Sequence, residues 1–228
     1  MKIKYKYSKK AFSRWTKSSA YWAGFIMADG CIYDRDHRLS ISLKNTDKSH
    51  VEKFAKFLKC DHPVKEYSFY CSSRDKRYNG AFIQITSIYL CNQLKLFGIG
   101  PRKSLTALWP KNIPSQYELS FLRGLFDGDG TICRYRPDRD YYKFSVIGTL
   151  DIVTNVRRVI EDILGESFGA ICQAGKVWRY QINSTKQVIR IGDALYKGTL
   201  DAFRLERKYN LYQEIQSLKR ASSPLTGT

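Results

Sequence analysis

Apolar and polar side chains alternate strictly along residues 38–44 of this chain. Leucine and isoleucine hold every second position, and the positions between them carry Arg38, Ser40, Ser42 and Lys44. Period-two alternation is typical of a β-strand with one face in the core and the other face open. The segment therefore predicts an antiparallel sheet with one covered face and one face that is free to bind a partner.

The rest of the first half extends this pattern of strands and helices. After a short apolar helix we predict strands 32–36 and 38–44, a helix to about residue 59, strands 66–72 and 81–87, and a helix over 88–97. Asn45, Thr46 or Asp47 can cap the middle helix, so we interpret Asp47 as a cap and not as a catalytic acid. The segment 73–80 is basic and rich in turn-forming residues, which predicts a hairpin loop.

The second half repeats the same order of elements. We predict a helix from Ser115, strands 131–136 and 142–147, a helix over 152–164, strands 168–173 and 177–183, and a closing helix. Repetition of a whole set of elements indicates an internal repeat. We therefore predict an α+β fold of two pseudo-symmetric αββαββα halves, residues 18–108 and 115–228, joined by a linker at 109–114 that contains two prolines.

Residues 1–17 carry seven positively charged side chains and no negatively charged one. Lysines alternate there with Ile3, Tyr5 and Tyr7. The segment is therefore either an arm that lies along phosphates or a short edge strand whose lysines prevent further pairing. We favour the arm and treat residues 1–17 as a basic N-terminal arm.

One short helix occurs twice, over residues 20–30 and again over residues 120–130. The copies end in Asp29 and Asp129, which are 100 residues apart, and a glycine follows each acid. Glycine at this place is suited to a left-handed C-terminal cap. At the start of the second copy, Ser115 and Glu118 have the spacing of a capping box.

Small residues recur four positions apart in both copies, as Gly24 and Ala28 and as Gly124 and Gly128. Positions four apart share one face of a helix, and a face without large side chains lets two backbones approach closely. If the two helices pack side by side and parallel, the two terminal acids meet where both helix dipoles already place negative charge. Two carboxylates in such a place need a divalent cation between them.

The repeated motif resembles that of the LAGLIDADG homing endonucleases, in the single-chain form that carries two motifs. Residues 22–30 and 122–130 match the motif in residue type. In that family the last acid of each motif binds the catalytic metal, and these positions are Asp29 and Asp129 here. The earlier acid position, which is not the catalytic one, holds Met27 in one copy and Asp127 in the other.

This resemblance implies a fold and an activity. The motif helices would form the interface between the halves, and the antiparallel sheets would form a DNA-binding saddle in the major groove. The enzyme would hydrolyse one phosphodiester per strand of a long, mostly asymmetric double-stranded site, as a monomer. Asp29, Asp129 and the backbone oxygens of Ala28 and Gly128 would hold Mg²⁺. We expect Mn²⁺ to substitute, and Ca²⁺ to support binding without efficient cleavage.

The composition also favours a nucleic-acid partner. With 39 Lys and Arg against 21 Asp and Glu, the formal net charge is +18 and the pI is near 9.7. A surplus of this size attracts a polyanion, and no run approaches the roughly 20 apolar residues of a membrane span. The first residues lack the apolar stretch of a secretory signal, so we expect an intracellular protein of the cytoplasm, nucleoid or an organelle matrix. The six scattered cysteines are interpreted as reduced thiols.

The open sheet faces and the hairpin turns supply the predicted DNA contacts. Arginine and glutamine can bind guanine and adenine edges through paired hydrogen bonds, whereas lysine and serine mostly hold phosphates. In the first half these contacts are Tyr33, Arg35, Arg38, Ser40, Ser42, Lys44, Arg74, Arg77 and Gln84. In the second half they are Arg134, Tyr135, Arg136, Lys143, Ser145, Gln173, Lys176, Arg179 and Gln181. For the basic active-site side chain that the resemblance implies, the candidates are Lys44 and Lys186.

Three classes of function stay open at this point. The leading hypothesis is a site-specific DNA endonuclease, and the second is an RNA-binding maturase that assists intron splicing on the same fold. The third is a DNA-binding regulator that has lost cleavage, against which the retention of two mutually repulsive carboxylates argues. The sequence defines neither the target site nor the host element, whether intron, phage or free-standing gene.

Overall fold

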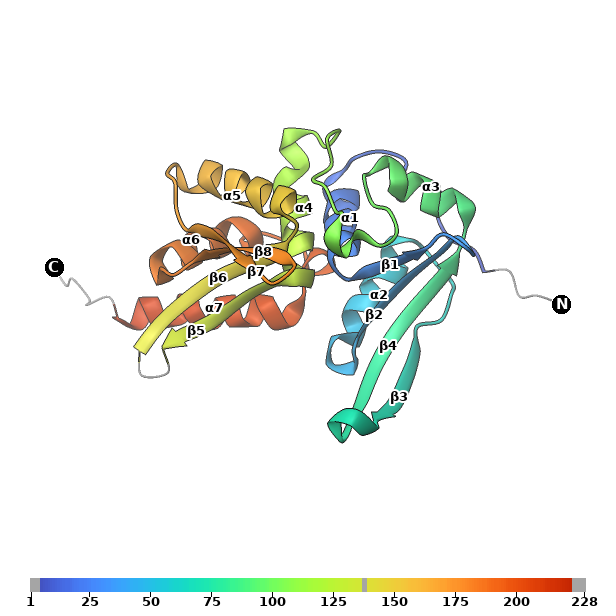
Figure 1. The fold of residues 1–228 in the computed structure, drawn as a ribbon, viewed down its shortest axis with the longest axis horizontal. Coiled ribbons are helices and arrows are strands. Elements are labelled where there is room, and N and C mark those ends of the chain that lie inside the picture. The colour runs from blue at the N-terminus through green and yellow to red at the C-terminus, as the bar shows by residue number, and fades with distance from the viewer. Residues whose placement is uncertain (1–4, 137–138, 223–228) are drawn as a thin grey trace.

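The computed structural model describes residues 5–136 and 139–222, which form two similar halves (Figure 1). The first half contains α1 (Lys17–Asp29), β1 (Gly30–Tyr33), β2 (Arg38–Lys44), α2 (Lys48–Phe57), β3 (Lys65–Cys71), β4 (Lys76–Thr86) and α3 (Ile88–Leu96). The second half contains α4 (Ser115–Asp129), β5 (Gly130–Arg136), β6 (Arg139–Gly148), α5 (Leu150–Leu164), β7 (Ala170–Ala174), β8 (Val177–Ile182) and α6 (Thr185–Tyr196). The predicted α+β fold with the αββαββα order is confirmed in both halves.

One further helix follows the repeat in the second half. A short 3₁₀ turn at Asp201–Phe203 leads into α7 (Glu206–Ser222), which packs against α6 and β5. Pattern analysis does not predict α7, because its polar residues outnumber its apolar ones. Among the described residues, no helix is both long and apolar enough to span a membrane.

The strands form two antiparallel sheets with the orders β1-β2-β4-β3 and β5-β6-β8-β7. Helices α2 and α3 contact the first sheet, and α5 and α6 contact the second. In Figure 1 the two sheets lie on either side of α1 and α4 and diverge from each other below them. Along β2 the leucine and isoleucine positions 39 and 41 are buried, as the alternation predicts. The predicted loop 73–80 is shorter than expected, because β4 already pairs with β3 from Lys76.

Helices α1 and α4 pack side by side through their glycines. A Cβ atom at Gly24 would lie 2.0 Å from the carbonyl oxygen of Phe121, and one at Gly124 would lie 1.8 Å from that of Tyr21. Only hydrogen fits at both positions, so the two backbones touch. Farther along, a Cβ at Gly128 would lie 2.2 Å from the Cβ of Ala28. The helices therefore run parallel and bring their C-terminal ends together.

The two helices begin in different ways. Thr16 and Ser19 form a capping box at the start of α1, with the Ser19 backbone N–H donating to Thr16 Oγ1 at 3.0 Å. Helix α4 begins after Pro114 without a side-chain cap, so the predicted capping box of Ser115 and Glu118 is wrong. The backbone of residue 115 is already helical, which leaves its hydroxyl out of the cap position.

Glu118 helps instead to anchor the segment that joins the halves. It accepts a hydrogen bond from Trp109 Nε1 at 3.1 Å and forms an ion pair with Arg158 on α5. The Trp109 backbone N–H donates to Asp151 Oδ2 at 2.6 Å, and its side chain is buried. The start of the predicted linker 109–114 is therefore packed onto the second half.

Gly30 and Gly130 follow α1 and α4 in extended conformation, with φ of −76° and −78°. The predicted left-handed caps are therefore wrong. A Cβ at Gly30 would lie 2.6 Å from the Ile26 side chain, and one at Gly130 would lie 2.0 Å from the Phe126 ring. Glycine is needed at these positions for space, since the strand leaves the helix directly over its last turn.

The N-terminal segment is part of the first half rather than a detached arm. Residues 5–16 form neither a helix nor a strand, so the edge-strand alternative does not hold within them. The Ser8 N–H donates to the Leu58 carbonyl oxygen at 2.7 Å, and Tyr7 shares a 2.5 Å hydrogen bond with Ser87. Phe12 is only 1% exposed. Lysines 2 and 4 lie outside the described residues.

We expect Phe12→Ala to lower the free energy of unfolding by about 3 kcal/mol, because it empties a buried site between aromatic rings. The Phe12 ring lies 5.4 Å from that of Phe57 and 5.7 Å from that of Phe97. Urea unfolding measures the effect. Lys10→Gln is the control, since this lysine is exposed and its replacement should leave stability unchanged. Equal stability of Phe12→Ala and wild type would show that the segment does not contribute to the core, as expected for an arm that lies along phosphates.

Candidate active site and nucleic-acid interface

Asp29 and Asp129 lie together, because each ends one of the two packed helices. A Cβ at Gly128 would lie 3.4 Å from Asp29 Oδ2, so the last turn of α4 packs against the first acid. Asp129 borders a hollow of about 190 Å³, which Ala28 and Lys103 also line. Both carboxylates reach solvent at this place while protein atoms surround them on the other sides.

The surroundings favour the protonated form of both acids. Burial raises the pKa of Asp29 above its ordinary value, although Lys208 and Lys103 act in the opposite direction. Burial raises the pKa of Asp129 to about 6, and repulsion from the Asp29 carboxylate adds to this increase. Positive charge added beside the two carboxylates would offset the repulsion between them.

Two lysines that sequence analysis does not single out hold the ends of the motif helices. Lys103, in the 3₁₀ turn that follows α3, donates to the carbonyl oxygens of Ala28, at 3.3 Å, and Gly30. Lys208 on α7 does the same in the second half, donating to the carbonyl oxygens of Phe126 at 2.5 Å, Gly128 at 3.3 Å and Gly130 at 2.5 Å. Ammonium groups are favourable at helix C-termini, where unpaired carbonyl oxygens gather.

The two candidates predicted for this basic role lie elsewhere. Lys44 is exposed at the end of β2, and Lys186 on α6 borders a separate cavity with Tyr142 and Ile189. Among the described residues, neither makes a hydrogen bond or ion pair with Asp29 or Asp129. A lone lysine carries no sequence signal, and only the matching places of residues 103 and 208 after α3 and α6 could have indicated them.

The donor atoms at this place fit a hard divalent cation. Carboxylate and carbonyl oxygens are the protein ligands that Mg²⁺ accepts, and Mg²⁺ keeps several of its waters. The carbonyl oxygens of Ala28 and Gly128 can accept from a lysine and still face a cation, because each has two lone pairs. In the described part of the chain there is no group of three or more His, Cys, Asp or Glu side chains that could hold a metal ion. Backbone oxygens and water would therefore have to complete the coordination.

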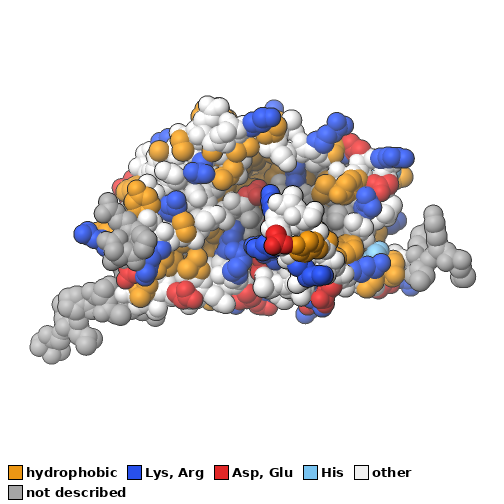
Figure 2. Space-filling view, turned by 60° about the horizontal axis from the view of Figure 1, so that its bottom comes forward, with side chains coloured by type: hydrophobic (Ala, Val, Ile, Leu, Met, Phe, Trp, Pro, Cys, Tyr) orange, Lys and Arg blue, Asp and Glu red, His pale blue; other side chains and the backbone are white. Residues whose placement is uncertain are grey.

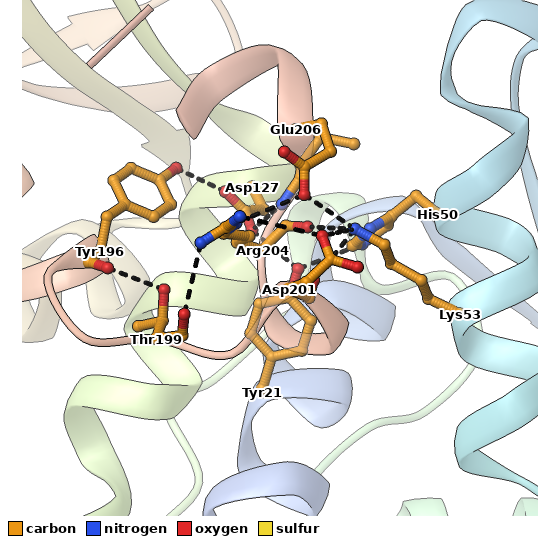
Figure 3. A network of polar contacts seen from close by, with 10 residues as sticks. Tyr21, His50, Lys53, Asp127, Tyr196, Thr199, Asp201, Arg204 and Glu206 are labelled. Carbon is orange, nitrogen blue, oxygen red and sulfur yellow. Dashed lines mark hydrogen bonds and ion pairs between the residues drawn. The ribbon is translucent and has the colours of Figure 1, made fainter. Parts of the chain in front are cut away.

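Asp127 is fully buried and joins three elements through its carboxylate (Figure 3). It accepts hydrogen bonds from Tyr21 Oη on α1 at 2.7 Å and from Tyr196 Oη on α6 at 2.6 Å. A third bond comes from the Leu205 backbone N–H at 2.8 Å. Burial raises the pKa of Asp127, while the nearby Lys208 ammonium and these donors act against that increase.

This network fixes where Lys208 lies. The backbone N–H of Lys208 donates to the Leu205 carbonyl oxygen at 3.0 Å in the first turn of α7. Leu205, whose own N–H is bound by Asp127, therefore also fixes the start of that helix. Lys53 on α2 makes a second connection between the halves, donating to Asp201 Oδ1 at 2.9 Å and Glu206 Oε1 at 3.0 Å. Burial lowers the pKa of Lys208 to about 8.

Most of the predicted DNA contacts share the open faces of the two sheets. Strand register places Tyr33, Arg38, Ser40, Ser42, Lys44 and Gln84 on one face of the first sheet. It places Lys143, Ser145, Arg179 and Gln181 on the corresponding face of the second sheet, where Lys143 Nζ lies 5.9 Å from the centroid of the Tyr135 ring. The exposed turns and hairpin tips hold Arg35, Arg74 and Lys176.

Three other predicted contacts lie on the reverse faces. Gln173 pairs with Trp178, one position out of phase with the Cys172–Arg179 pair, so its predicted place on the open face is wrong. Arg77 pairs with Tyr70, and Arg134 pairs with Tyr142, which again puts both on the helix side of their sheets. A one-residue error in phase moves a side chain to the other face. The Arg136 side chain lies outside the described residues.

Asp47 lies at the predicted cap position of α2 but does not cap the helix with its side chain. Arg207 on α7 donates to Asp47 Oδ2 at 3.4 Å instead. The acid therefore contributes to the connection between α2 and α7.

Figure 2 shows the molecule from the side of the open sheet faces. The surface is hollowed in the middle, and lysine and arginine side chains lie around the hollow. The paired acids lie at the ends of α1 and α4, between the two sheets (Figure 1). The arrangement can hold a polyanion across both faces and present two carboxylates to it.

Comparison with known proteins supports the fold. The sequence matches no protein-family model and no curated protein. The structure is similar to meganuclease I-AabMI bound to uncleaved DNA, with a TM-score of 0.54 and 17% identity over 88% of this chain and 90% of that one. It is similar to the homing endonuclease I-WcaI bound to its DNA recognition sequence, with a TM-score of 0.62 and 13% identity over 88% and 91%.

A third similar structure is the N-terminal LAGLIDADG domain of DUF199/WhiA, with a TM-score of 0.51 and 17% identity over 85% of this chain and 84% of that domain. The chain covers 64% of full-length DUF199/WhiA from Thermatoga maritima. Together these similarities show that the chain has the two-half LAGLIDADG fold. The fold alone does not distinguish a nuclease from a protein that only binds DNA. The distinction depends on the chemistry of the residues at the ends of α1 and α4.

We expect Asp129→Asn to stabilise the metal-free protein at pH 8 and to leave its stability unchanged near pH 3.5. The folded-state pKa of about 6 lies above the unfolded value. The stability that protonated Asp129 contributes is therefore present below about pH 4 and is lost as the pH rises through about 6. Asparagine keeps it at every pH. Since the carboxylate reaches solvent, we expect about 1 kcal/mol.

Thermal unfolding of both proteins in EDTA between pH 3.5 and pH 8 measures this difference. Asp162→Asn is the control, because that acid is 73% exposed on α5, away from the paired acids. A difference between Asp129→Asn and wild type that did not change with pH would show that the carboxylate is not strained by its surroundings.

Proposed function

We propose that this chain is a site-specific DNA endonuclease that hydrolyses one phosphodiester in each strand of a duplex. The observation that carries the proposal is the pairing of Asp29 and Asp129 at two helix ends, with a lysine on the adjoining carbonyl oxygens of each helix. A protein that only binds DNA gains nothing from two carboxylates between its basic faces, because they repel the phosphates. A metal-dependent nuclease uses such carboxylates to hold its catalytic cation.

The chain's own residues take separate roles in this proposal. The open faces hold the duplex on both sides of the acids, so that one scissile phosphate of each strand lies near Asp29 and Asp129. Lys103 is only partly buried and can reach a phosphate or its attacking water, whereas Lys208 is buried and orients the carbonyl oxygens at the end of α4. The Asp127 network keeps Lys208 in this position.

A divalent cation is part of the proposal. Asp29, Asp129 and the carbonyl oxygens of Ala28 and Gly128 would hold Mg²⁺, with Mn²⁺ as a substitute. When bound, the cation would supply the activation of water and the stabilisation of charge at the leaving oxygen. The repulsion between the two carboxylates, which contributes to the raised pKa of Asp129, is the physical reason that they would favour added positive charge.

The two halves differ in their binding surfaces, which favours a long and asymmetric target. Strand β4 has 11 residues and its counterpart β8 has 6, so the outer hairpin of the first half reaches farther than that of the second. Both acids come from one chain, so a monomer carries the complete candidate site.

Cleavage selection from a randomised duplex library with Mg²⁺ tests the proposal. We expect linear products with cuts at a fixed position in each strand, and sequencing their ends gives the target. Enrichment of a bound sequence without any product in Mg²⁺ or Mn²⁺ would favour the DNA-binding regulator. Preferential binding to structured RNA, with no selected duplex, would favour the maturase.

We expect Lys103→Met to slow cleavage of the selected site by about 10- to 100-fold while DNA affinity changes by less than about 3-fold. The lysine acts at the chemical step in the proposal, and its charge is one of many on the binding surface. Lys44→Met is the matched control on the open face, where loss of a phosphate contact should weaken affinity more than the single-turnover rate. The reverse result for the two variants would return the basic role to Lys44.

A further inference from the structure

Four aromatic side chains form a stripe on the open face of the outer hairpin, β3–β4. They are Tyr67, Phe69, Tyr78 and Phe82, and we call them the aromatic stripe. Register places them on this face, since Phe69 pairs with Tyr78 and Phe82 pairs with both Lys65 and Ser42.

The rings of the stripe are packed on one another. Ring centroids are 6.0 Å apart between Tyr67 and Phe69, and 5.3 Å apart between Phe69 and Tyr78, with interplanar angles of 21° and 17°. Gly80 makes room for the first ring, because a Cβ there would lie 2.4 Å from the Tyr67 side chain. Ser42 Oγ also donates to Tyr67 Oη at 3.1 Å. The stripe is therefore a pre-ordered surface that loses little conformational entropy on binding.

None of these four rings belongs to the hydrophobic core of the described residues. Phe69 remains 51% exposed, and Tyr67, Tyr78 and Phe82 are half-buried. In the second half the corresponding hairpin is shorter, and its open face carries no aromatic residue among those described; it holds Ala170, Cys172, Ala174, Val177, Arg179 and Gln181. A row of packed, partly exposed aromatic rings that only one of the two outer hairpins carries indicates a ligand-specific role.

Basic residues border the stripe. Lys76 Nζ lies 5.7 Å from the Tyr78 ring centroid, Lys65 pairs with Phe82, and Arg74 lies at the hairpin tip. In Figure 2 hydrophobic side chains interrupt the lysines and arginines on the open side of the molecule. An apolar centre with a cationic border matches a DNA major groove, where thymine methyl groups lie between two rows of phosphates.

We propose that the aromatic stripe recognises the 5-methyl groups of thymine, so that the half-site under β3–β4 is selected for T·A pairs. This inference rests on the proposed function and specifies which DNA feature the first half recognises. Among base-pair edges in the major groove only thymine presents a methyl group, and apolar side chains discriminate it by contact. Unpaired bases are less suited as ligands, because a base could stack only by separating rings that already pack on each other.

The test replaces single thymines of the selected target by deoxyuridine, which removes only the methyl group. Duplex affinity is measured in Ca²⁺, so that the readout does not depend on cleavage. We expect about a 3- to 10-fold loss at one or more positions in the half-site under β3–β4. Deoxyuridine in the other half-site should have no such effect.

Phe69→Ala should weaken the thymine duplex and should remove the difference between thymine and deoxyuridine at the same positions. Leu96→Ala is the control, because this leucine is 65% exposed on α3, outside the sheet face. The inference is overturned if the selected half-site contains no thymine, if deoxyuridine is tolerated throughout it, or if Phe69→Ala keeps the full deoxyuridine penalty. Loss of single-stranded RNA binding in Phe69→Ala, with no deoxyuridine effect, would assign the rings to base stacking instead.

Separate results test the nuclease function and the role of the aromatic stripe. A target that is selected and cut but insensitive to deoxyuridine contradicts the role of the aromatic stripe and leaves the nuclease intact. Failure to select any duplex contradicts both.

Discussion

Asp29→Asn and Asp129→Asn are each expected to reduce double-strand cleavage by at least about 1,000-fold while DNA affinity stays equal or rises. Asparagine has nearly the shape of aspartate but lacks the charge that would hold a divalent cation. It also removes the repulsion between the two acids and between each acid and a phosphate. Loss of chemistry together with a gain in affinity would be hard to obtain from a purely structural defect.

Each variant is assayed on a plasmid that carries the selected target, with nicked and linear products measured separately, and its affinity is measured in Ca²⁺. Asp162→Asn on α5 is the control and should cut like wild type. Double-strand cutting by either variant at the wild-type rate would refute the paired-carboxylate mechanism. Loss of affinity in a folded variant would show that the acids serve recognition rather than catalysis.

Gly124→Ala is expected to lower the free energy of unfolding by about 4 kcal/mol or more, which is a large part of the total for a natural domain. The added Cβ would lie 1.8 Å from the Tyr21 carbonyl oxygen and 2.8 Å from the Phe25 backbone nitrogen. Both atoms belong to the backbone of α1, so no side-chain rotation can relieve the clash. The helices would have to separate, and the paired acids would separate with them.

Urea unfolding and circular dichroism measure this effect. Gly100→Ala is the matched control, because a Cβ there would have no neighbour within 4 Å, and we expect its stability to stay within about 0.5 kcal/mol of wild type. If Gly124→Ala folded with wild-type stability, the close contact between α1 and α4 would not be needed for the fold.

Periodicity and repetition in the sequence determined the fold class. The alternation at residues 38–44 and the repeated helix carry local information, since a strand or an amphipathic helix places its side chains by its own geometry. The strict four-residue spacing of Gly24 and Ala28 and of Gly124 and Gly128 likewise predicted the helix pair, because close packing needs small residues wherever two backbones touch. For these features no knowledge of distant contacts was required.

The sequence determined less well which face of a strand each residue occupies and whether the N-terminal segment is packed on the core. The sequence pattern places Gln173 on the wrong face of its sheet, because a short strand with few apolar residues does not fix which residues point inward. The sequence indicates that glycine is needed after the two acids, but the reason is the limited space beside Ile26 and Phe126 and not a left-handed backbone conformation. Phe12 looked like part of a basic arm, because nothing local distinguishes an apolar residue in a core from one in a tail.

The tertiary structure alone decided which basic side chains meet the two acids at the ends of the motif helices. Asp29 and Asp129 could be paired from the repeat, since each acid is fixed by its own helix. Lys103 and Lys208 reach those helices from segments 73 to 82 residues away in the chain, and no pattern encodes such a contact. Asp127 gains its three donors in the same way, from α1, α6 and the chain before α7. Local periodicity records which face of an element is buried, and only the packed chain determines which distant polar groups share that interior.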